Sequence, residues 1–196
     1  MQFEHTFKQY DAELEAVRAK VLQMGGLVEQ QIVNALDALV NANASLAESV
    51  IANDHRVNGL EVQVDEDCSH IIARRQPAAG DLRMIMMMVK TITDLERIGD
   101  EATKIARVAQ KIYESDRMYT PRFAEIKTMV GLVREMLRTS LDAFARLDVS
   151  KTVDVARQDE QVDEQFRAAM RQLITFMLED PRTGSAVRGQ GCRAYR

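Results

Sequence analysis

Two carboxylates stand four residues apart in the segment TITDLERIGDEATKIA: they are Glu96 and Asp100. On a helix with about 100° per residue they rise along one side, and Glu96 points in nearly the same direction as Ile85 and Ile92, on the face expected to enter the core. A charged carboxylate beside apolar neighbours is costly unless a cation or a basic side chain neutralises it. The pattern therefore predicts a neutralising partner, either a metal ion or a basic group, beside Glu96 and Asp100.

A second row of oxygen-bearing side chains occurs at helical spacing earlier in the chain. Its members are Asp54, Asn58, Glu61 and Asp65. Next to it runs an apolar row that consists of Val50, Val57, Val64 and Ile71. Oxygen donors on two packed helices can enclose magnesium, manganese, iron or zinc, and the cation would offset the cost of burying the carboxylates. Two alternatives stay open: the earlier row is a solvated flank of its helix, or Glu96 is paired with an arginine from another helix.

The composition narrows the classes of function. The chain has 196 residues and a formal net charge of -4, which gives no general attraction to nucleic acids. Its longest apolar run, Met84 to Val89, is far shorter than the roughly 20 residues of a membrane span, and charges interrupt the N-terminal segment where a signal peptide is apolar. The sequence contains no nucleophile elbow, phosphate-binding loop or dinucleotide fingerprint. These features predict a cytoplasmic protein that is not an enzyme and binds neither nucleic acid nor, directly, a membrane.

Apolar residues recur at intervals of three and four along most of the chain, which predicts an all-α fold. Helix-breaking residues divide the pattern into five helices, which are expected at residues 10–44, 45–75, 81–114, 120–147 and 150–179. Ser45 with Glu48 has the sequence pattern of a capping box, so Ser45 is predicted to cap the second helix. Asp81 follows Gly80 and is predicted to cap the third helix.

The second half of the chain resembles the first. At an offset of 105 positions, residues 19–57 match residues 124–162 at many places, including Gly26 with Gly131. The predicted fold class is therefore a pair of tandem three-helix bundles that arose by internal duplication.

The duplication divides the chain into three predicted parts. Residues 1–116 form the first three-helix bundle, residues 117–180 form a second bundle that lacks its third helix, and residues 181–196 are irregular. The missing helix indicates truncation or a shifted reading frame after about residue 183. An open pair of helices favours self-association, because it leaves apolar faces uncovered. The side chains expected on those faces are Leu132, Met136, Val162, Ala169, Leu173 and Phe176.

Three stretches of the sequence resemble the PhoU family, whose members are accessory regulators of bacterial phosphate transport. They are MGGLVEQQI at residues 24–32, RQPAAGDLR at 75–83 and DLERIGDEATKIA at 94–106. The family fold is an internal duplication of two three-helix bundles, and its hallmark is a Glu-x-x-x-Asp motif in the third helix of each bundle, where metal clusters bind. The resemblance implies that Glu96 and Asp100 are metal ligands. It adds further members of two acidic faces: Asp54, Asn58 and Asp94 in the first half, and Asp159 and Asp163 in the second.

The resemblance also implies a regulatory role. A member of this family is expected to act in the cytoplasm as a negative regulator of high-affinity phosphate uptake and of phosphate-starvation signalling. It would be an adaptor between the ATPase subunit of the phosphate transporter and the phosphate-sensing histidine kinase, and would meet the membrane only through these partners. A homodimer is expected as well. The alternative is a structural or metal-storage helical protein without signalling partners, and a carboxylate-bridged metalloenzyme is the third possibility.

Overall fold

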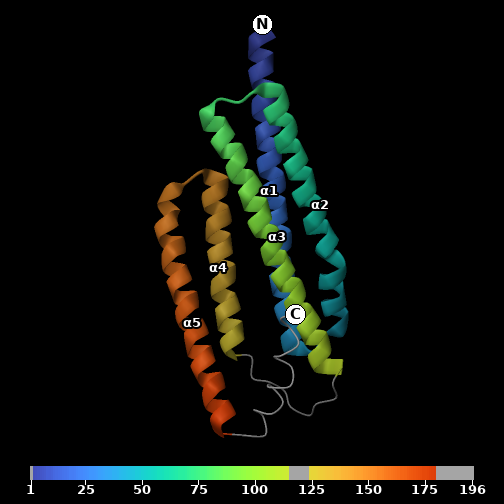
Figure 1. Cartoon of the computed structure of the whole chain (residues 1–196), viewed down its shortest axis with the longest axis vertical. Helices are drawn as coiled ribbons and strands as arrows, with labels where there is room; N and C mark the ends of the chain where they lie inside the picture. The colour runs from blue at the N-terminus through green and yellow to red at the C-terminus, as the bar shows by residue number, and fades with distance from the viewer. Residues whose placement is uncertain (1, 115–123, 180–196) are drawn as a thin grey trace, which may run out of the picture.

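The computed structural model describes residues 2–114 and 124–179, and every regular element in them is a helix (Figure 1). In chain order these are α1 (Gln2–Asn41), α2 (Ala44–Arg75), α3 (Ala79–Glu114), α4 (Ala124–Arg146), the short 3-10 helix η1 (Val149–Lys151) and α5 (Thr152–Glu179). The predicted all-α class is therefore confirmed. None of the described helices is long and apolar enough to cross a membrane. Three of the sequence predictions fall outside the described residues. They are the helix start at residue 120, the bundle boundary at residues 116 and 117, and the irregular tail at 181–196.

The starts of α2 and α3 differ from the predicted caps. Asn43 caps α2: its backbone is extended, and its Oδ1 accepts a hydrogen bond from the backbone N–H of Leu46 at 3.0 Å. The prediction of Ser45 as the cap is wrong, because an amide two residues earlier already satisfies a free N–H of the first turn. The prediction of Asp81 as the cap of α3 is also wrong, since the helix starts at Ala79 and Asp81 lies within its first turn.

The first three helices pack against one another along their lengths and form a three-helix bundle. All three contribute fully buried side chains: Val21, Met24 and Val28 from α1, Val57 and Val64 from α2, and Ile85, Met88 and Ile92 from α3. The predicted apolar row of α2 is confirmed, because each of its members is buried. Burial of one such side chain contributes about 1.5–3 kcal/mol relative to exposure, so a close-packed apolar layer fixes the seam between α2 and α3.

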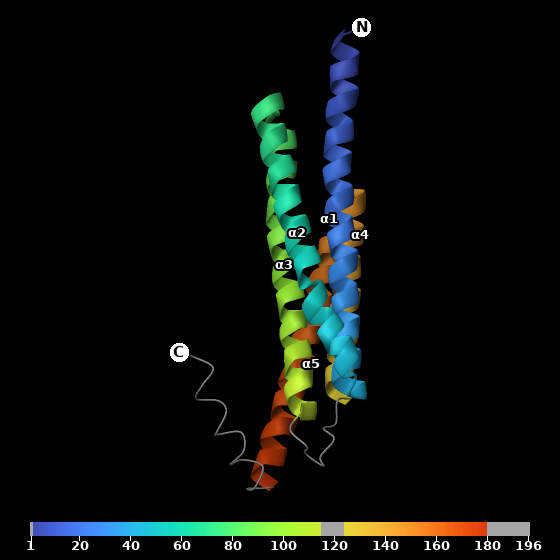
Figure 2. The same cartoon turned by 90° about the vertical axis from the view of Figure 1, so that its right-hand side faces the viewer.

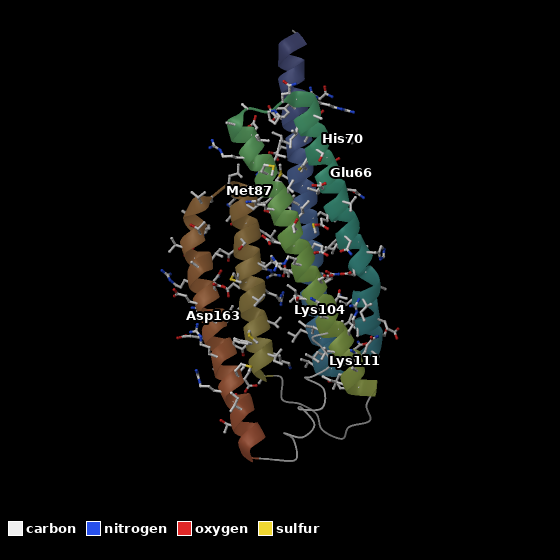
Figure 3. All side chains as sticks on the ribbon, in the orientation of Figure 1. Glu66, His70, Met87, Lys104, Lys111 and Asp163 are labelled. Atoms are coloured by element: carbon white, nitrogen blue, oxygen red, sulfur yellow. The ribbon has the colours of Figure 1, made fainter. Side chains whose placement is uncertain are left out.

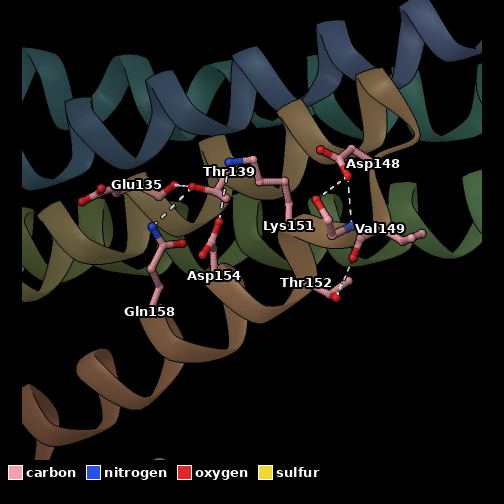
Figure 4. Close-up of polar contacts among 9 residues, drawn as sticks. Glu135, Thr139, Asp148, Val149, Lys151, Thr152, Asp154 and Gln158 are labelled. Atoms are coloured by element: carbon pink, nitrogen blue, oxygen red, sulfur yellow. Dashed lines mark hydrogen bonds and ion pairs between the residues drawn. The ribbon is translucent and has the colours of Figure 1, made fainter.

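A capped turn holds α4 and α5 side by side as a helical hairpin (Figure 4). Asp148 starts the turn, and its Oδ1 accepts hydrogen bonds from the backbone N–H of Ser150 at 3.0 Å and from the Ser150 hydroxyl at 2.6 Å. Further along the pair, Gln158 Nε2 on α5 donates to Thr139 Oγ1 on α4 at 3.3 Å. The hydrogen bonds from Ser150 lower the pKa of Asp148, so this carboxylate stays charged and continues to cap the turn at neutral pH.

The two halves of the molecule meet where α4 crosses α1, and their contacts follow the internal repeat. Residues further along α1 contact residues that lie earlier in α4. Earlier in α1, Arg18 Nη2 donates to the Ala145 carbonyl at 2.6 Å; further along, Glu29 Oε1 accepts from Arg134 Nη2 at 3.2 Å. The two helices are therefore antiparallel and adjacent, as Figures 1 and 2 show. Glu29 and Arg134 are 105 positions apart, which is the repeat offset. A contact between equivalent positions lies on a local two-fold axis, and this axis relates α1 to α4.

Gly25 allows the closest approach in the contact between α1 and α4. A Cβ at this position would lie 2.6 Å from Leu141 Cδ2 and 2.7 Å from Leu141 Cδ1, so the missing side chain leaves space for Leu141 against α1. The neighbouring Gly26 is exposed, and a Cβ there would meet nothing within 4 Å. Close packing of the two halves therefore depends on the first member of the glycine pair.

The hairpin of α4 and α5 has no third helix in the described residues. There, α5 packs only against α4 and η1, and Phe166, Met170 and Ile174 expose 53%, 41% and 52% of their surfaces. The second bundle is thus incomplete in the described part of the chain. Four of the six side chains predicted on the uncovered faces are partly covered. Half-buried instead are Leu132, Met136, Val162 and Ala169, and the side chains of Leu173 and Phe176 lie outside the described set.

Candidate metal site

Glu96 and Asp100 lie half-buried on α3, as the helical periodicity predicted. On the core side of the same helix, Ile92 and Thr103 are each 1% exposed. On its outer side, Arg97 exposes 76% of its side chain. The two carboxylates therefore stand at the edge of the apolar layer, where water screens a charge incompletely and the neighbouring groups decide what that charge costs.

Carboxylates from two helices gather at this edge. Burial raises the pKa of Glu96 above its ordinary value, and the negative charges of Asp100, Glu61 and Asp54 raise it further, while Arg97 opposes the shift. Asp54 and Glu61 come from α2, and Glu96 and Asp100 come from α3; we call these four residues the carboxylate cluster. Within the described residues no ion pair reaches Glu96. The alternative in which an arginine of another helix neutralises it finds no support there.

A hydrogen bond across the seam between α2 and α3 orients Asp54. Thr103 Oγ1 donates to Asp54 Oδ1 at 3.0 Å, and Thr103 is almost fully buried. The rest of the predicted row on α2 divides into two groups: Glu61 is half-buried, whereas Asn58 and Asp65 are exposed. Asp54 and Glu61 therefore lie at the seam between α2 and α3, whereas the other two members of the row lie on the solvated flank of α2.

A buried amide from α1 lies behind the carboxylate cluster. Gln31 is 5% exposed, and neither its Nε2 nor its Oε1 has a hydrogen-bond partner among the described residues. Its Oε1 lies 3.0 Å from the position that a Cβ on Gly99 would take. Gly99 directly precedes Asp100, so the amide approaches α3 at the turn that carries the carboxylates. Three helices thus bring polar side chains to the same level of the bundle.

A comparison with protein-family models identifies the family of the chain. The model of the PhoU domain matches residues 21–109 and 126–189. The chain belongs to the PhoU family. It is 47% identical over 184 residues to the phosphate-specific transport system accessory protein PhoU homolog of Pseudomonas putida, a match that covers 93% of this chain and 71% of that protein. The PhoU accessory protein of Escherichia coli (strain K12) is 44% identical over 179 residues, with 91% and 73% covered.

Solved PhoU structures share the fold. The crystal structure of PhoU from Pseudomonas aeruginosa matches with a TM-score of 0.83 at 46% identity, and the match covers 90% of this chain and 84% of that one. The phosphate transport system regulatory protein PhoU from Streptococcus pneumoniae matches with a TM-score of 0.80 at 28% identity, with 87% and 80% covered. The resemblance to the PhoU family seen in the sequence is therefore confirmed.

In this PhoU chain the remaining predicted ligands stand apart from the carboxylate cluster. Asp94 exposes 72% of its side chain and pairs with Arg97 at 3.7 Å. Asp159 and Asp163 are exposed on α5, which packs against neither α2 nor α3. Figure 3 shows Asp163 on α5, with α4 between it and the first bundle. The second acidic face of this PhoU chain is therefore an exposed row on one helix.

The donors at the carboxylate cluster suit a hard or borderline cation. Carboxylate oxygens bind magnesium, manganese, iron and zinc, and a cation would offset the burial and the repulsion that raise the pKa of Glu96. However, nowhere in the described residues do three His, Cys, Asp or Glu side chains form a group that could hold a metal. The positions of the four carboxylates therefore do not by themselves make a metal site, and Gln31 is an unpaired buried amide at the same level of the bundle.

The predicted row of oxygen donors includes Glu61, but the sequence predictions name neither Thr103 nor Gln31, which this structure brings to the same level of the bundle. Glu61 lies three residues after Asn58 in the predicted row, so helical spacing alone points to it. Thr103 lies seven residues after Glu96 and therefore on the same side of α3. Gln31 lies in the MGGLVEQQI stretch at residues 24–32, but the sequence does not indicate its contact with α3, because that contact depends on how α1 packs against α3.

Glu96→Gln is expected to stabilise this PhoU chain at neutral pH when divalent cations are removed with EDTA. The raised pKa means that the folded state disfavours the charged carboxylate more than the unfolded state does. The stability gained from protonation is full below the unfolded pKa near 4.5 and is lost as the pH rises through the folded pKa. Glutamine resembles the protonated form at every pH. We expect the melting temperature at pH 7 to rise by about 2–4 °C, equivalent to about 1 kcal/mol in a chain of this size.

Thermal unfolding followed by circular dichroism from pH 4 to pH 8 measures this difference, which should vanish at the acidic end. Glu101→Gln is the matched control, because Glu101 is exposed and pairs with Lys104 at 2.7 Å; this change should bring no gain. A Glu96→Gln variant that melts below the wild type at pH 7 would show that the carboxylate is already neutralised in the folded chain.

Proposed function

We propose that this chain is an accessory regulator of phosphate transport that restrains both phosphate uptake and phosphate-starvation signalling. The observation that carries the proposal is its 47% identity, over 93% of its length, to a protein named for the phosphate-specific transport system. The relative from Streptococcus pneumoniae, with a TM-score of 0.80, is named as a regulatory protein of the phosphate transport system. A role in regulation rather than catalysis agrees with both names.

In this proposal the chain acts in the cytoplasm as an adaptor between the ATPase subunit of the transporter and the phosphate-sensing histidine kinase. The arrangement of the helices supports it: two halves related by a local two-fold axis, joined through α1 and α4, present separate long faces on one molecule. Two partners can be held at once on such faces. A homodimer belongs to the same proposal, and the exposed apolar side chains of α5 support it because uncovered apolar surface favours association.

The proposal includes a divalent cation at the carboxylate cluster, either magnesium, manganese, iron or zinc. When bound, the cation would supply positive charge that neutralises the cluster. The residues of the chain would bind and orient it: Asp54 is already oriented by Thr103 across the seam, and Glu96 and Asp100 approach from α3. Because α2 and α3 both contribute donors, a bound cation would also hold these helices together.

Expression of the chain in a bacterium that lacks its own PhoU-family regulator tests this proposal. A reporter driven by a phosphate-starvation promoter should be repressed at high phosphate, and the ATPase subunit and the histidine kinase should both co-purify with the tagged chain. An empty vector and the Escherichia coli relative serve as the negative and positive controls. A folded, well-expressed chain that binds metal but leaves the reporter active and retains neither partner would favour the storage alternative.

A further inference from the structure

The outer edge of the molecule carries an uncovered apolar row on α5. In the described part of the chain α5 packs only against α4 and η1, and Figure 1 shows it beyond α4 from the first bundle. Phe166, Met170 and Ile174 follow one another at intervals of four residues, so they lie along one side of the helix. Each of them exposes between 41% and 53% of its surface. A row of large exposed apolar side chains is typical of a surface that another molecule covers.

The internal repeat shows that a third helix placed as α3 is would leave this row open. At the offset of 105 positions, the three residues of the row correspond to three polar residues of α2: Glu61, Asp65 and Ser69. Although α3 packs against α2, Glu61 is only half-buried and the other two are exposed. The register of the repeat holds along α5, because the half-buried Val162 and Ala169 correspond to the buried Val57 and Val64. The apolar row is therefore suited to a contact outside its own bundle.

A row of charged side chains runs beside the apolar row and changes sign along α5. Asp159 and Asp163 are followed at the same spacing of four residues by Arg167 and Arg171, and all four are exposed. Three of these charged residues each precede a member of the apolar row by three positions, so the two rows are neighbours on the helix surface. This side of α5 thus has an acidic first half and a basic second half along an apolar centre.

We propose that a second copy of this chain covers the apolar row, with the two α5 helices packed antiparallel around a two-fold axis. The acidic half of each helix then faces the basic half of the other, and the two apolar rows meet between the helices. A parallel pair would place like charges side by side. An interface in which one patch meets itself must be self-complementary, and a charged row that changes sign near its middle meets this requirement. The inference rests on the homodimer of the proposed function and names its interface.

Charge reversal on α5 tests the antiparallel pairing. Asp159→Arg with Asp163→Arg makes the charged row entirely basic, and Arg167→Asp with Arg171→Asp makes it entirely acidic. In sedimentation at low ionic strength, each double variant should self-associate about tenfold or more weakly than the wild type, because like charges now face one another. An equimolar mixture of the two double variants should restore the dimer. All four positions are exposed, so the melting temperatures should stay close to that of the wild type.

Shortened side chains in the apolar row provide an independent measurement. Phe166→Ser with Ile174→Ser should also lower the affinity of self-association by about tenfold or more, because the two rows lose their apolar contact. Val62→Ser is the matched control, since Val62 is an apolar residue on α2 that exposes 55% of its surface. The control variant should dimerise as the wild type does.

The outcomes separate this inference from the proposed function. A wild-type chain that stays monomeric at every concentration rejects the homodimer and this interface together, but leaves the regulatory role to its own reporter test. A dimer that none of the α5 variants weakens has its interface elsewhere and overturns the inference alone. Two charge-reversed variants that are both monomeric and do not pair with each other also overturn it, because the two charged halves would then not face one another.

Discussion

Glu96→Ala combined with Asp100→Ala is expected to lower the affinity of the chain for divalent cations by about 100-fold or more. Changes to groups that only support metal ligands cost about 10–100-fold, and the double variant removes both carboxylates that α3 contributes to the cluster. Asp54 and Glu61 would remain, both from α2. Titration with Mn²⁺ after chelation, together with metal analysis of the purified chain, measures the loss.

The same double variant should fold well, and this separates lost binding from lost structure. Two repelling carboxylates disappear from a half-buried edge, so the cation-free variant should melt no lower than the wild type. Glu101→Ala is the matched control on the same helix, because Glu101 is exposed and next to Asp100 in sequence. Equal metal content in the wild type and the double variant would reject the carboxylate cluster as a cation site.

The same Mn²⁺ titration tests whether the second acidic face, formed by Asp159 and Asp163 on α5, binds a cation when both residues are replaced by alanine. These carboxylates have the same spacing of four residues as Glu96 and Asp100, but both are exposed. Water already stabilises their charges, so the electrostatic reason for a cation is weaker there. We expect the Asp159→Ala and Asp163→Ala pair to leave the stoichiometry and affinity unchanged.

Helical periodicity accounts for most of the fold that could be predicted. The core face of α2, from Val50 to Ile71, follows from spacing alone, because a buried stripe must repeat every three to four residues. The ends of helices depend on single hydrogen bonds, and periodicity does not detect them. Asn43 rather than Ser45 caps α2 for this reason. The place where the halves join depends on the contact between Gly25 and Leu141, which the sequence indicates only as a glycine pair.

The candidate site shows the same division between local and long-range causes. Glu96 and Asp100 are one turn apart, so one helix suffices to place them together. Asp94 is two residues before Glu96, which turns it about 200° around the helix and away from the cluster. The family resemblance implies that Asp94 is a ligand, but helical geometry places it on the other side of α3. Gln31 is absent from any such pattern because its contact with Gly99 joins two helices through packing.

Gly25→Val is expected to destabilise the chain by about 1–3 kcal/mol, the usual cost of forcing extra atoms into a packed contact. Even a single Cβ at position 25 would lie 3.2 Å from Leu141 Cγ and closer still to both its methyl carbons, so the Leu141 side chain must leave its present place against α1. In the described residues α4 provides the contact between the hairpin and the first bundle. The hairpin should therefore loosen first, and hydrogen exchange should accelerate in α4 before it does in α2 or α3.

Gly26→Val provides the matched control, because the same side chain placed one residue later points into open space. Valine is a better helix former than glycine by a few tenths of a kcal/mol, so this variant should be neutral or slightly more stable in urea. Adding Leu141→Ala to Gly25→Val should recover part of the lost stability, since the smaller residue makes room for the valine. If Gly25→Val and Gly26→Val unfold at the same urea concentration, the contact between Gly25 and Leu141 does not hold the two halves together. Polar contacts such as the ion pair of Glu29 with Arg134 would then join α1 to α4.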